Sequence, residues 1–189
     1  MNVARILYPV QVLGPGNRIG LWLCGCARAC KGCSNPELWN PRPEYEIEPN
    51  KVFELIDKIA SAHKVDGFTI SGGEPMDQAK ELSSLIKQMI SVSKDILIYT
   101  GYRLEALRSK EDEWIDDILQ EAAVLVDGEY IEELNDDTVL RGSSNQRVHI
   151  LNDKYAERYQ QYLAEAHNQI QNFTTSDGIV SVGIHHPTF

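Results

Sequence analysis

Residues 19–36 read IGLWLCGCARACKGCSNP, an apolar run followed by a short loop that carries three cysteines. Cys26, Cys30 and Cys33 have the spacing C-x3-C-x2-C. Three thiolates can hold three irons of a [4Fe–4S] cube, whose usual complement is four cysteines. The fourth iron is then open to a ligand. The segment therefore predicts an iron–sulfur centre that can act as a reagent as well as an electron store.

A fourth cysteine, Cys24, ends the apolar run and is interpreted as a small buried hydrophobe. The alternative is a zinc site made by Cys24, Cys26, Cys30 and Cys33. Structural zinc sites usually pair two C-x2-C knuckles that lie apart in the sequence, and only Cys30 and Cys33 form one here. Zinc is therefore the less favoured metal. Disulfides are less favoured still, because a chain of 189 residues can bury a core without cross-links.

The composition limits the possible partners and compartments. The chain has 28 acidic and 18 basic residues, and its net charge of −10 is a poor match for nucleic acid or an anionic membrane surface. No apolar run approaches the length of a membrane span. Residues 1–12 contain Pro9 and are typical of a strand rather than a signal peptide. We expect a cytoplasmic protein that binds neither nucleic acid nor membrane.

Short apolar strands alternate with amphipathic helices along the chain. The strands are expected at residues 6–13, 19–24, 67–71, 96–100, 124–126 and 148–151. One helix is expected to be capped by Asn50, with Val52, Leu55 and Ile56 on its apolar face. This order predicts an α/β fold with a mostly parallel sheet. A closed eight-stranded barrel typically needs about 250 residues. An incomplete, TIM-like barrel is therefore expected.

We expect a single domain over residues 1–189, with a core at about 5–151. Residues 152–189 are expected to add a helix over 155–166 and a hairpin over 172–183 that turns at 176–178. His185 and His186 are interpreted as an exposed tail. The acidic stretch 129–137 is interpreted as a solvated loop, with a docking surface for a partner as the alternative.

Polar motifs follow the predicted strands. Gly72-Gly73-Glu74, Thr100-Gly101-Tyr102 and Asp127 each stand directly after or at the end of one. Ligands of parallel sheets gather at the carboxyl ends of strands, so these motifs and the cysteine loop are expected to converge. The glycine pair allows the backbone to approach a ligand closely. Bulky side chains at Gly72 or Gly73 are expected to exclude that ligand and to leave the metal centre intact.

Together these segments resemble the radical S-adenosylmethionine activating enzymes of glycyl-radical proteins. The cysteine loop points to the superfamily, and residues 100–102 and 141–146 point to the activators of anaerobic ribonucleoside-triphosphate reductase. Many members of the superfamily have an aromatic residue before the third cysteine, where this chain has Gly32. The matching segments are residues 14–18, 26–35, 71–75, 99–102, 124–128 and 141–146.

The resemblance implies a radical S-adenosylmethionine domain with one [4Fe–4S] cluster held by Cys26, Cys30 and Cys33. S-adenosylmethionine would bind the open iron. The residues implied in cofactor binding are Gly32, Cys33, Ser34, Gly72, Gly73, Glu74 and Asp127. A flavodoxin or similar donor would reduce the cluster. The 5′-deoxyadenosyl radical so released would take a hydrogen from a glycine Cα of the partner reductase. No side-chain acid or base is expected, since the cluster and cofactor carry the chemistry.

Two alternatives remain open from the sequence. One is a radical enzyme of the same superfamily that activates another glycyl-radical protein or acts on a small molecule. The other is a metal-binding module with no enzymatic activity. The segment Gly72-Gly73-Glu74 disfavours the module, because a structural metal site has no need of it.

Overall fold

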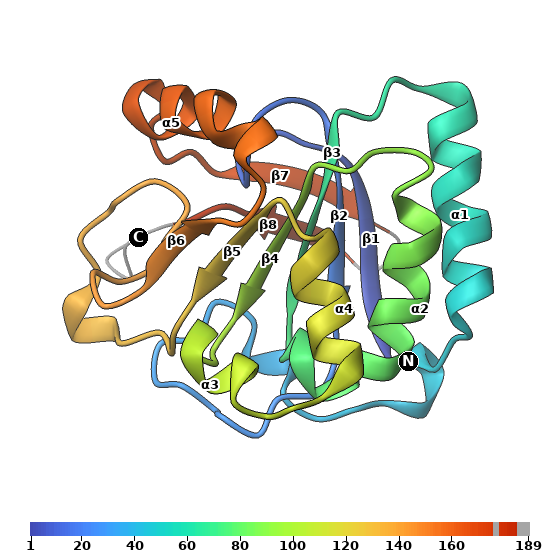
Figure 1. Ribbon diagram of the computed structural model, residues 1–189, viewed down its shortest axis with the longest axis horizontal. Coiled ribbons are helices and arrows are strands. Elements are labelled where there is room, and N and C mark those ends of the chain that lie inside the picture. The colour runs from blue at the N-terminus through green and yellow to red at the C-terminus, as the bar shows by residue number, and fades with distance from the viewer. Residues whose placement is uncertain (176–177, 185–189) are drawn as a thin grey trace.

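A six-stranded sheet organises the computed structural model, which describes residues 1–175 and 178–184 (Figure 1). Its strands lie side by side in chain order: β1 (Val3–Val10), β2 (Arg18–Leu23), β3 (Gly67–Gly72), β4 (Ile96–Thr100), β5 (Val124–Asp127) and β6 (Arg147–Ile150). Strands β2 to β5 are parallel, whereas β1 and β6 run antiparallel at the two edges. The predicted α/β fold with a mostly parallel sheet is confirmed. Each edge strand pairs with one neighbour, so the sheet is open across the described residues.

Helices connect the parallel strands and complete the chain after the sheet. The α-helices are α1 (Pro49–Ala62), α2 (Ala79–Met89), α3 (Leu104–Arg108), α4 (Glu113–Glu121) and α5 (Ala156–Glu165). Single-turn helices are η1 (Pro36–Leu38), η2 (Pro43–Tyr45), η3 (Pro75–Gln78), η4 (Glu132–Leu134) and η5 (Asp153–Tyr155). A separate hairpin follows α5 and consists of β7 (Gln171–Thr175) and β8 (Gly178–Val182).

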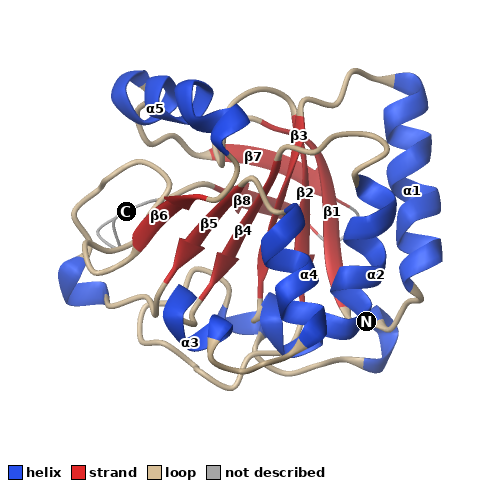
Figure 2. Ribbon diagram, in the orientation of Figure 1, coloured by secondary structure: helices blue, strands red, loops and turns tan. Residues whose placement is uncertain are grey.

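The sequential strand order determines where the helices lie. Each crossover from β2 to β5 moves one strand along in the same direction, and such crossovers are almost always right-handed. Helices α1, α2 and α4 therefore cover one face of the sheet, and Figure 2 shows α2 and α4 in front of the strands. The large buried apolar side chains that these helices contribute are Val52, Ile56, Leu82, Leu85, Ile86, Met89, Ile115 and Ile118.

The second face of the sheet is covered by the end of the chain. Alternate strand residues point to this face, among them Trp22 on β2 and Val126 on β5. Val182 of β8 packs in one buried cluster with Trp22, and Tyr159 of α5 packs in another with Val126. Figure 1 shows β7 and β8 behind the sheet. The hairpin and α5 thus occupy the side that no crossover helix reaches.

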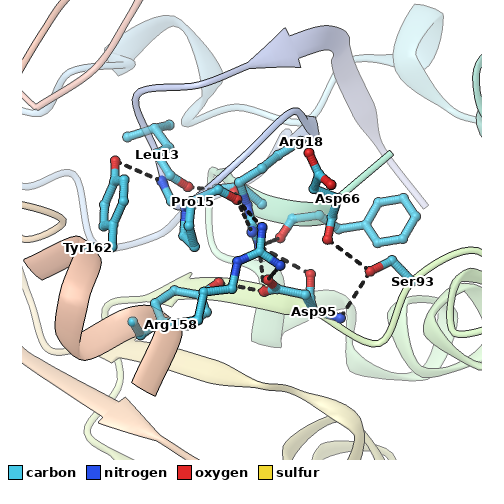
Figure 3. A network of polar contacts seen from close by, with 12 residues as sticks. Leu13, Pro15, Arg18, Asp66, Ser93, Asp95, Arg158 and Tyr162 are labelled. Atoms are coloured by element: carbon cyan, nitrogen blue, oxygen red, sulfur yellow. Dashed lines mark hydrogen bonds and ion pairs between the residues drawn. The ribbon is translucent and has the colours of Figure 1, made fainter. Parts of the chain in front are cut away.

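A buried polar network fixes α5 to the amino ends of the strands (Figure 3). The Arg18 side chain is fully buried, forms an ion pair of 3.1 Å with Asp95 Oδ1 and donates from Nε to Thr69 Oγ1 at 2.8 Å. From α5, the Tyr159 hydroxyl donates to Asp95 Oδ1 at 2.6 Å, and Arg158 Nη1 lies 3.1 Å from Asp95 Oδ2. Asp95 therefore joins the C-terminal helix to the sheet.

Two details of the first helix differ from the prediction. The helix begins at Pro49, a residue favoured in the first turn, so Asn50 lies inside the helix and does not cap it. The Asn50 side chain instead accepts a hydrogen bond from Gln88 Nε2 at 3.1 Å. Leu55 is 42 % exposed, because the core-facing stripe narrows to Val52 and Ile56.

The first strand and the C-terminal elements can also be compared with the prediction. The first strand runs from Val3 to Val10, three residues earlier than expected at each end, because residues 11–17 form the turn that leads into β2. The C-terminal helix and hairpin are confirmed. Residues 176–177 of the predicted turn and the pair His185 and His186 lie outside the described residues. In the part of the chain that the structure describes, no helix combines the length and apolar character that crossing a bilayer requires.

Candidate functional site

The loops that follow β2, β3, β4 and β5 surround one cavity at the carboxyl ends of the strands. The cysteine loop and the Gly-Gly-Glu segment follow the carboxyl ends of β2 and β3, whereas Arg18 and Asp95 lie at the amino ends of β2 and β4. Seven of the residues predicted for the site line it: Cys26, Cys30, Cys33, Ser34, Gly72, Gly73 and the buried Glu74. The structure thus brings the cysteine loop and the Gly-Gly-Glu segment together, as their positions after strands predict.

Backbone hydrogen bonds hold the cysteine loop in place. The Cys26 amide donates to the carbonyl of Trp39 at 2.8 Å, so the chain leaving the loop pairs with the chain entering it. Cys33 closes a turn by donating from its amide to Cys30 at 3.2 Å. All three thiols are partly exposed. The loop therefore presents Cys26, Cys30 and Cys33 on one cavity.

Cys24 has a different environment. Its side chain is 1 % exposed and packs with Trp22 and Leu38. Its Sγ donates to the carbonyl of Asn40 at 3.1 Å. This burial accords with the interpretation of Cys24 as a packing residue and sets it apart from the other three thiols.

The donor set fits an iron–sulfur cluster. Burial, and then the carboxylate of Glu129 with its Oε1 at 3.7 Å from the Cys30 sulfur, raises the pKa of the Cys30 thiol. A bound metal centre would supply the positive charge that stabilises the thiolates. Among the described residues, no three His, Cys, Asp or Glu side chains converge on a single ion position. A cube binds each thiolate through a different iron, so its ligands need no such convergence.

The two glycines allow β3 to pack directly on the cysteine loop. Gly72 has φ of +107°, and a Cβ there would lie 2.3 Å from the Leu23 carbonyl oxygen. A Cβ on Gly73 would lie 2.3 Å from the Gly25 carbonyl oxygen, which accepts from the Glu74 amide at 2.8 Å. These close contacts argue against the expectation that bulky side chains here would leave the metal centre intact, which stays a prediction. Such side chains would displace the backbone that carries the cysteines.

Glu74 is a buried residue whose carboxylate contacts the end of β3, the end of β4 and the cysteine loop. Its side chain accepts from Thr100 Oγ1 at 2.7 Å, from the Met76 amide at 3.0 Å and from the Gly101 amide at 2.8 Å. Arg28 Nε lies 3.4 Å from Glu74 Oε2. Burial raises the pKa of Glu74, and these hydrogen bonds oppose that rise. Glu74 therefore positions the ends of β3 and β4 against the cysteine loop.

Arg28 is a cavity residue that sequence reasoning missed. It stands between the first two cysteines, and its guanidinium carbon lies 4.1 Å from the centre of the Tyr102 ring. Lys110 Nζ lies 3.8 Å from the same ring centre. A Cβ on Gly101 would lie 2.4 Å from Arg28 Cδ, so this glycine leaves room for the arginine. The motif Thr-Gly-Tyr thus serves to hold Arg28 beside the cysteines.

The acidic stretch 129–137 contacts the cysteine loop and is not a freely solvated loop. Lys31 Nζ lies 3.0 Å from Glu132 Oε2 and 2.9 Å from Glu133 Oε1. Gly32 has φ of +71°, and a Cβ there would lie 2.7 Å from Glu132 Oε1. Gly32 therefore faces Glu132. A larger side chain at position 32 would meet Glu132, which gives a local reason why this chain has glycine rather than an aromatic residue before Cys33.

Asp127 is buried behind the cavity. Its Oδ2 accepts from the Leu104 amide and lies 2.8 Å from Arg147 Nη2, while Arg103 Nη1 lies 3.3 Å from Oδ1. Burial opposes ionisation, but the hydrogen bonds from Arg147 and Leu104 prevail and lower the pKa of Asp127 to about 2. Its neighbour Gly128 lines the cavity. The structure does not bring the Asp127 carboxylate into the group of residues around the cavity.

The segment 141–146 forms a further wall of the cavity through Gln146. The Gln146 side chain accepts from the Gly142 amide at 2.8 Å and donates to the Gly128 carbonyl at 2.8 Å. Gly142 and Gln146 both line the cavity. The segment that pointed to the reductase activators therefore supports the candidate site directly.

The C-terminal hairpin supplies the last wall. Val182, Gly183 and Ile184 line the cavity, as does Tyr99 of β4. Sequence reasoning missed these residues, because no motif marks them and the contact spans more than 80 residues of chain.

Comparison with known proteins relates the chain to a family and to named relatives. Residues 12–149 match the family described as a 4Fe-4S single cluster domain. The chain is similar to the anaerobic ribonucleoside-triphosphate reductase-activating protein of Enterobacteria phage T4, with 35 % identity over 78 % of this chain and 93 % of the relative. The protein of that name from Escherichia coli K12 is 32 % identical over 76 % of this chain and 96 % of its own length.

A third relative of the same name, from Vibrio cholerae, is 37 % identical over 75 % of this chain and 94 % of its own length. The cavity is built from loops that lie within the matched residues, apart from the wall that the hairpin adds. The chain therefore belongs to the family of anaerobic ribonucleoside-triphosphate reductase-activating proteins, with a 4Fe-4S single cluster domain as its matched part.

Proposed function

We propose that this protein is a radical S-adenosylmethionine activase that generates a glycyl radical on anaerobic ribonucleoside-triphosphate reductase. One observation carries the proposal. The thiols of Cys26, Cys30 and Cys33 share a cavity with Gly72 and Gly73, at the carboxyl ends of the strands. A cluster with an open iron and a backbone able to approach a ligand would then meet at one place.

Cys26, Cys30 and Cys33 would hold the [4Fe–4S] cluster, and Cys24 would remain a packing residue. When reduced by an external donor such as a flavodoxin, the bound cluster supplies the electron that cleaves the sulfonium of S-adenosylmethionine. The chain itself contributes position and electrostatics. The part of the cavity beside the three cysteines would stay open to a small polar ligand. The surrounding loops would enclose the remainder of the cavity.

The backbone of Gly72 and Gly73 would face the amino group of S-adenosylmethionine. Glu74 would act mainly by keeping that backbone in place, because three hydrogen bonds from the chain and the Arg28 ion pair already occupy its oxygens. Ser34 and Cys33 line the cavity and would contact the adenosyl part. The predicted contact from Asp127 would need its carboxylate to leave the arginines that bind it.

The fold type and the cellular compartment belong to the same proposal. The open sheet, with its sequential strands and helices on one face, would be the arc of an incomplete barrel of the radical S-adenosylmethionine type. The reaction would take place in the cytoplasm, where thiols stay reduced.

The proposal is tested by analysis of anaerobically reconstituted protein. We expect about four irons and four sulfides per chain, because three thiolates suit an open cube. With a strong reductant, the protein should convert S-adenosylmethionine to methionine and 5′-deoxyadenosine, measured by chromatography. Cys30→Ala should abolish both, whereas the buried Cys24→Ala should retain both. Stoichiometric zinc without iron uptake, or a cluster that never cleaves the cofactor, would contradict the proposal.

A further inference from the structure

A second cavity borders the cysteine loop and shares only two residues with the first cavity. Cys26 and Trp39 line both. The other residues that line the second cavity are Asn2, Cys24, Gly25, Ala27, Asn40, Pro41, Asp77 and Gln78. Neither Gly72 nor Gly73 lines it, so the second cavity reaches Cys26 from a part of the surface that the proposed cofactor site does not use.

Hydrogen bonds hold the residues of the second cavity in place. The Cys26 amide donates to the Trp39 carbonyl at 2.8 Å, which fixes the two shared residues against each other. The Gln78 side chain donates to the Cys24 carbonyl at 3.0 Å and accepts from the Asn2 amide at 2.6 Å. The chain around Cys26 is therefore fixed on the side of the second cavity as well.

The second cavity is open to solvent and poor in groups that would bind a small polar ligand. Four of its lining residues are exposed: Ala27, Asn40, Pro41 and Asp77. Apart from the thiols, Asp77 is the one ionisable side chain in the lining, and its Oδ1 already accepts from the Tyr102 hydroxyl at 2.8 Å. Such an opening suits contact with the surface of another protein better than it suits a charged cofactor.

The proposed reaction brings three molecules to one cluster. S-adenosylmethionine and the glycine-bearing segment of the reductase must both reach the first cavity, because hydrogen transfer requires the reacting atoms to be in contact. An electron needs no such contact with the cofactor and has only to arrive close to a ligand of the cluster. A donor at the second cavity would meet that need at Cys26 and leave the first cavity free for the other two molecules.

We propose that the second cavity is the docking site of the electron donor, a small protein that presents a reduced flavin at its surface. The flavin is oxidised by one electron, and that electron passes by way of Cys26 to the cluster, which is reduced; no bond forms or breaks. The assignment rests on the proposed function, because it takes the cluster on Cys26, Cys30 and Cys33 as the electron acceptor.

The test measures how fast the cluster of the loaded protein is reduced, followed by the loss of its visible absorbance in a stopped-flow instrument. Reduced flavodoxin is the protein donor, and dithionite is the small reductant for comparison. Asn40→Trp places a bulky side chain at the exposed edge of the second cavity, and the Asn40 carbonyl that accepts from Cys24 Sγ is kept. Gln161→Trp makes a matched change on the exposed face of α5.

Asn40→Trp should slow reduction by flavodoxin about tenfold or more, because an obstructed docking site lowers the rate of productive association. Gln161→Trp should keep the wild-type rate. With dithionite, all three proteins should be reduced equally fast, and all three should bind S-adenosylmethionine with equal affinity. If Asn40→Trp takes up less iron than the wild type, Asn40→Arg carries the same test with a more soluble side chain.

Three outcomes would overturn the assignment. A wild-type rate with flavodoxin in the Asn40 variants would show that the donor docks elsewhere, and a raised KM for the reductase in these variants would then give the second cavity to the reductase. Equal slowing with dithionite would show that Asn40 acts on the cluster itself. A wild-type cluster that dithionite reduces and flavodoxin does not would exclude the flavoprotein.

Failure of the proposed function gives a different result. A cluster that flavodoxin reduces at the expected rates, but that never cleaves S-adenosylmethionine, would overturn the proposed function and leave the docking site in place. Zinc in place of iron would overturn both.

Discussion

The Thr100 hydroxyl donates a hydrogen bond of 2.7 Å to the buried carboxylate of Glu74 and thereby joins the ends of two parallel strands. Glu74 follows β3, and Thr100 is the last residue of β4. The same carboxylate lies beside Arg28 of the cysteine loop. This pair therefore ties the cysteine loop to the sheet.

The first prediction concerns this hydrogen bond. Thr100→Val should lower the free energy of unfolding by about 1 kcal/mol or more, since a buried acceptor loses its donor. The pKa of Glu74, already raised by burial, should rise further, because the Thr100 hydroxyl opposes the effect of burial. A carboxyl with a raised pKa stabilises the fold most when protonated, below its unfolded pKa, and that stability is lost as the pH rises through its folded pKa.

The loss from Thr100→Val should therefore be larger at pH 8 than at pH 5. Urea unfolding of cluster-free protein at the two pH values measures it. Glu54→Gln on the exposed face of α1 is the control and should change little at either pH. A loss that is equal at both pH values would mean that Thr100 does not act through the charge of Glu74.

The second prediction concerns the acid stability that Asp127 confers. Its pKa is about 2 in the folded protein, against an ordinary value of 3.8. A depressed pKa adds stability above the unfolded pKa, and this is lost as the pH falls through the folded pKa. The contribution at pH 7 is about 2 kcal/mol. Asp127→Asn should destabilise the protein by at least that amount at pH 7, and the difference should shrink between pH 5 and pH 2.

Unfolding by urea at pH 7, 5 and 3 checks this dependence, with the exposed Asp57→Asn as the control. A difference between wild type and Asp127→Asn that stays constant over this range would show that the ion pairs with Arg103 and Arg147 contribute no charge-dependent stability.

The third prediction compares two glycines that both have positive φ. Gly72 has φ of +107° with the Leu23 carbonyl in the way of a Cβ, whereas Gly178 has φ of +129° with nothing within 4 Å. Both changes to alanine strain the backbone, but only Gly72→Ala also displaces the chain that leads into the cysteine loop. Gly72→Ala should therefore lose most of its iron after reconstitution, while Gly178→Ala keeps it. Iron analysis decides, and full iron content in Gly72→Ala would refute the packing role assigned to this glycine.

Much of the fold was predictable because it depends on local pattern. Apolar runs gave β2, β4 and β5 nearly to the residue, since buried parallel strands are continuous in apolar character. Cys24 was separable from the other cysteines because it ends such a run. The Gly-Gly-Glu segment was placed beside the cysteine loop because both follow neighbouring strands.

The rest depends on contacts between distant segments that leave no pattern. Nothing local shows that Lys31 pairs with Glu132 and Glu133. Likewise, the alternation along β4 shows that Tyr99 faces away from the helices but not that its hydroxyl lacks a partner. Burial of Asp127 behind Arg147 was hidden for the same reason, because a carboxylate at a strand end can face a cavity or a neighbouring strand.

The most direct test of the central claim is electron paramagnetic resonance of the protein mixed with anaerobic ribonucleoside-triphosphate reductase, S-adenosylmethionine and a strong reductant. The account predicts a glycyl radical on the reductase that requires this chain, survives in Cys24→Ala and disappears in Cys30→Ala. Absence of that radical with the wild-type chain, while the cofactor is consumed and a small metabolite is modified, would contradict it.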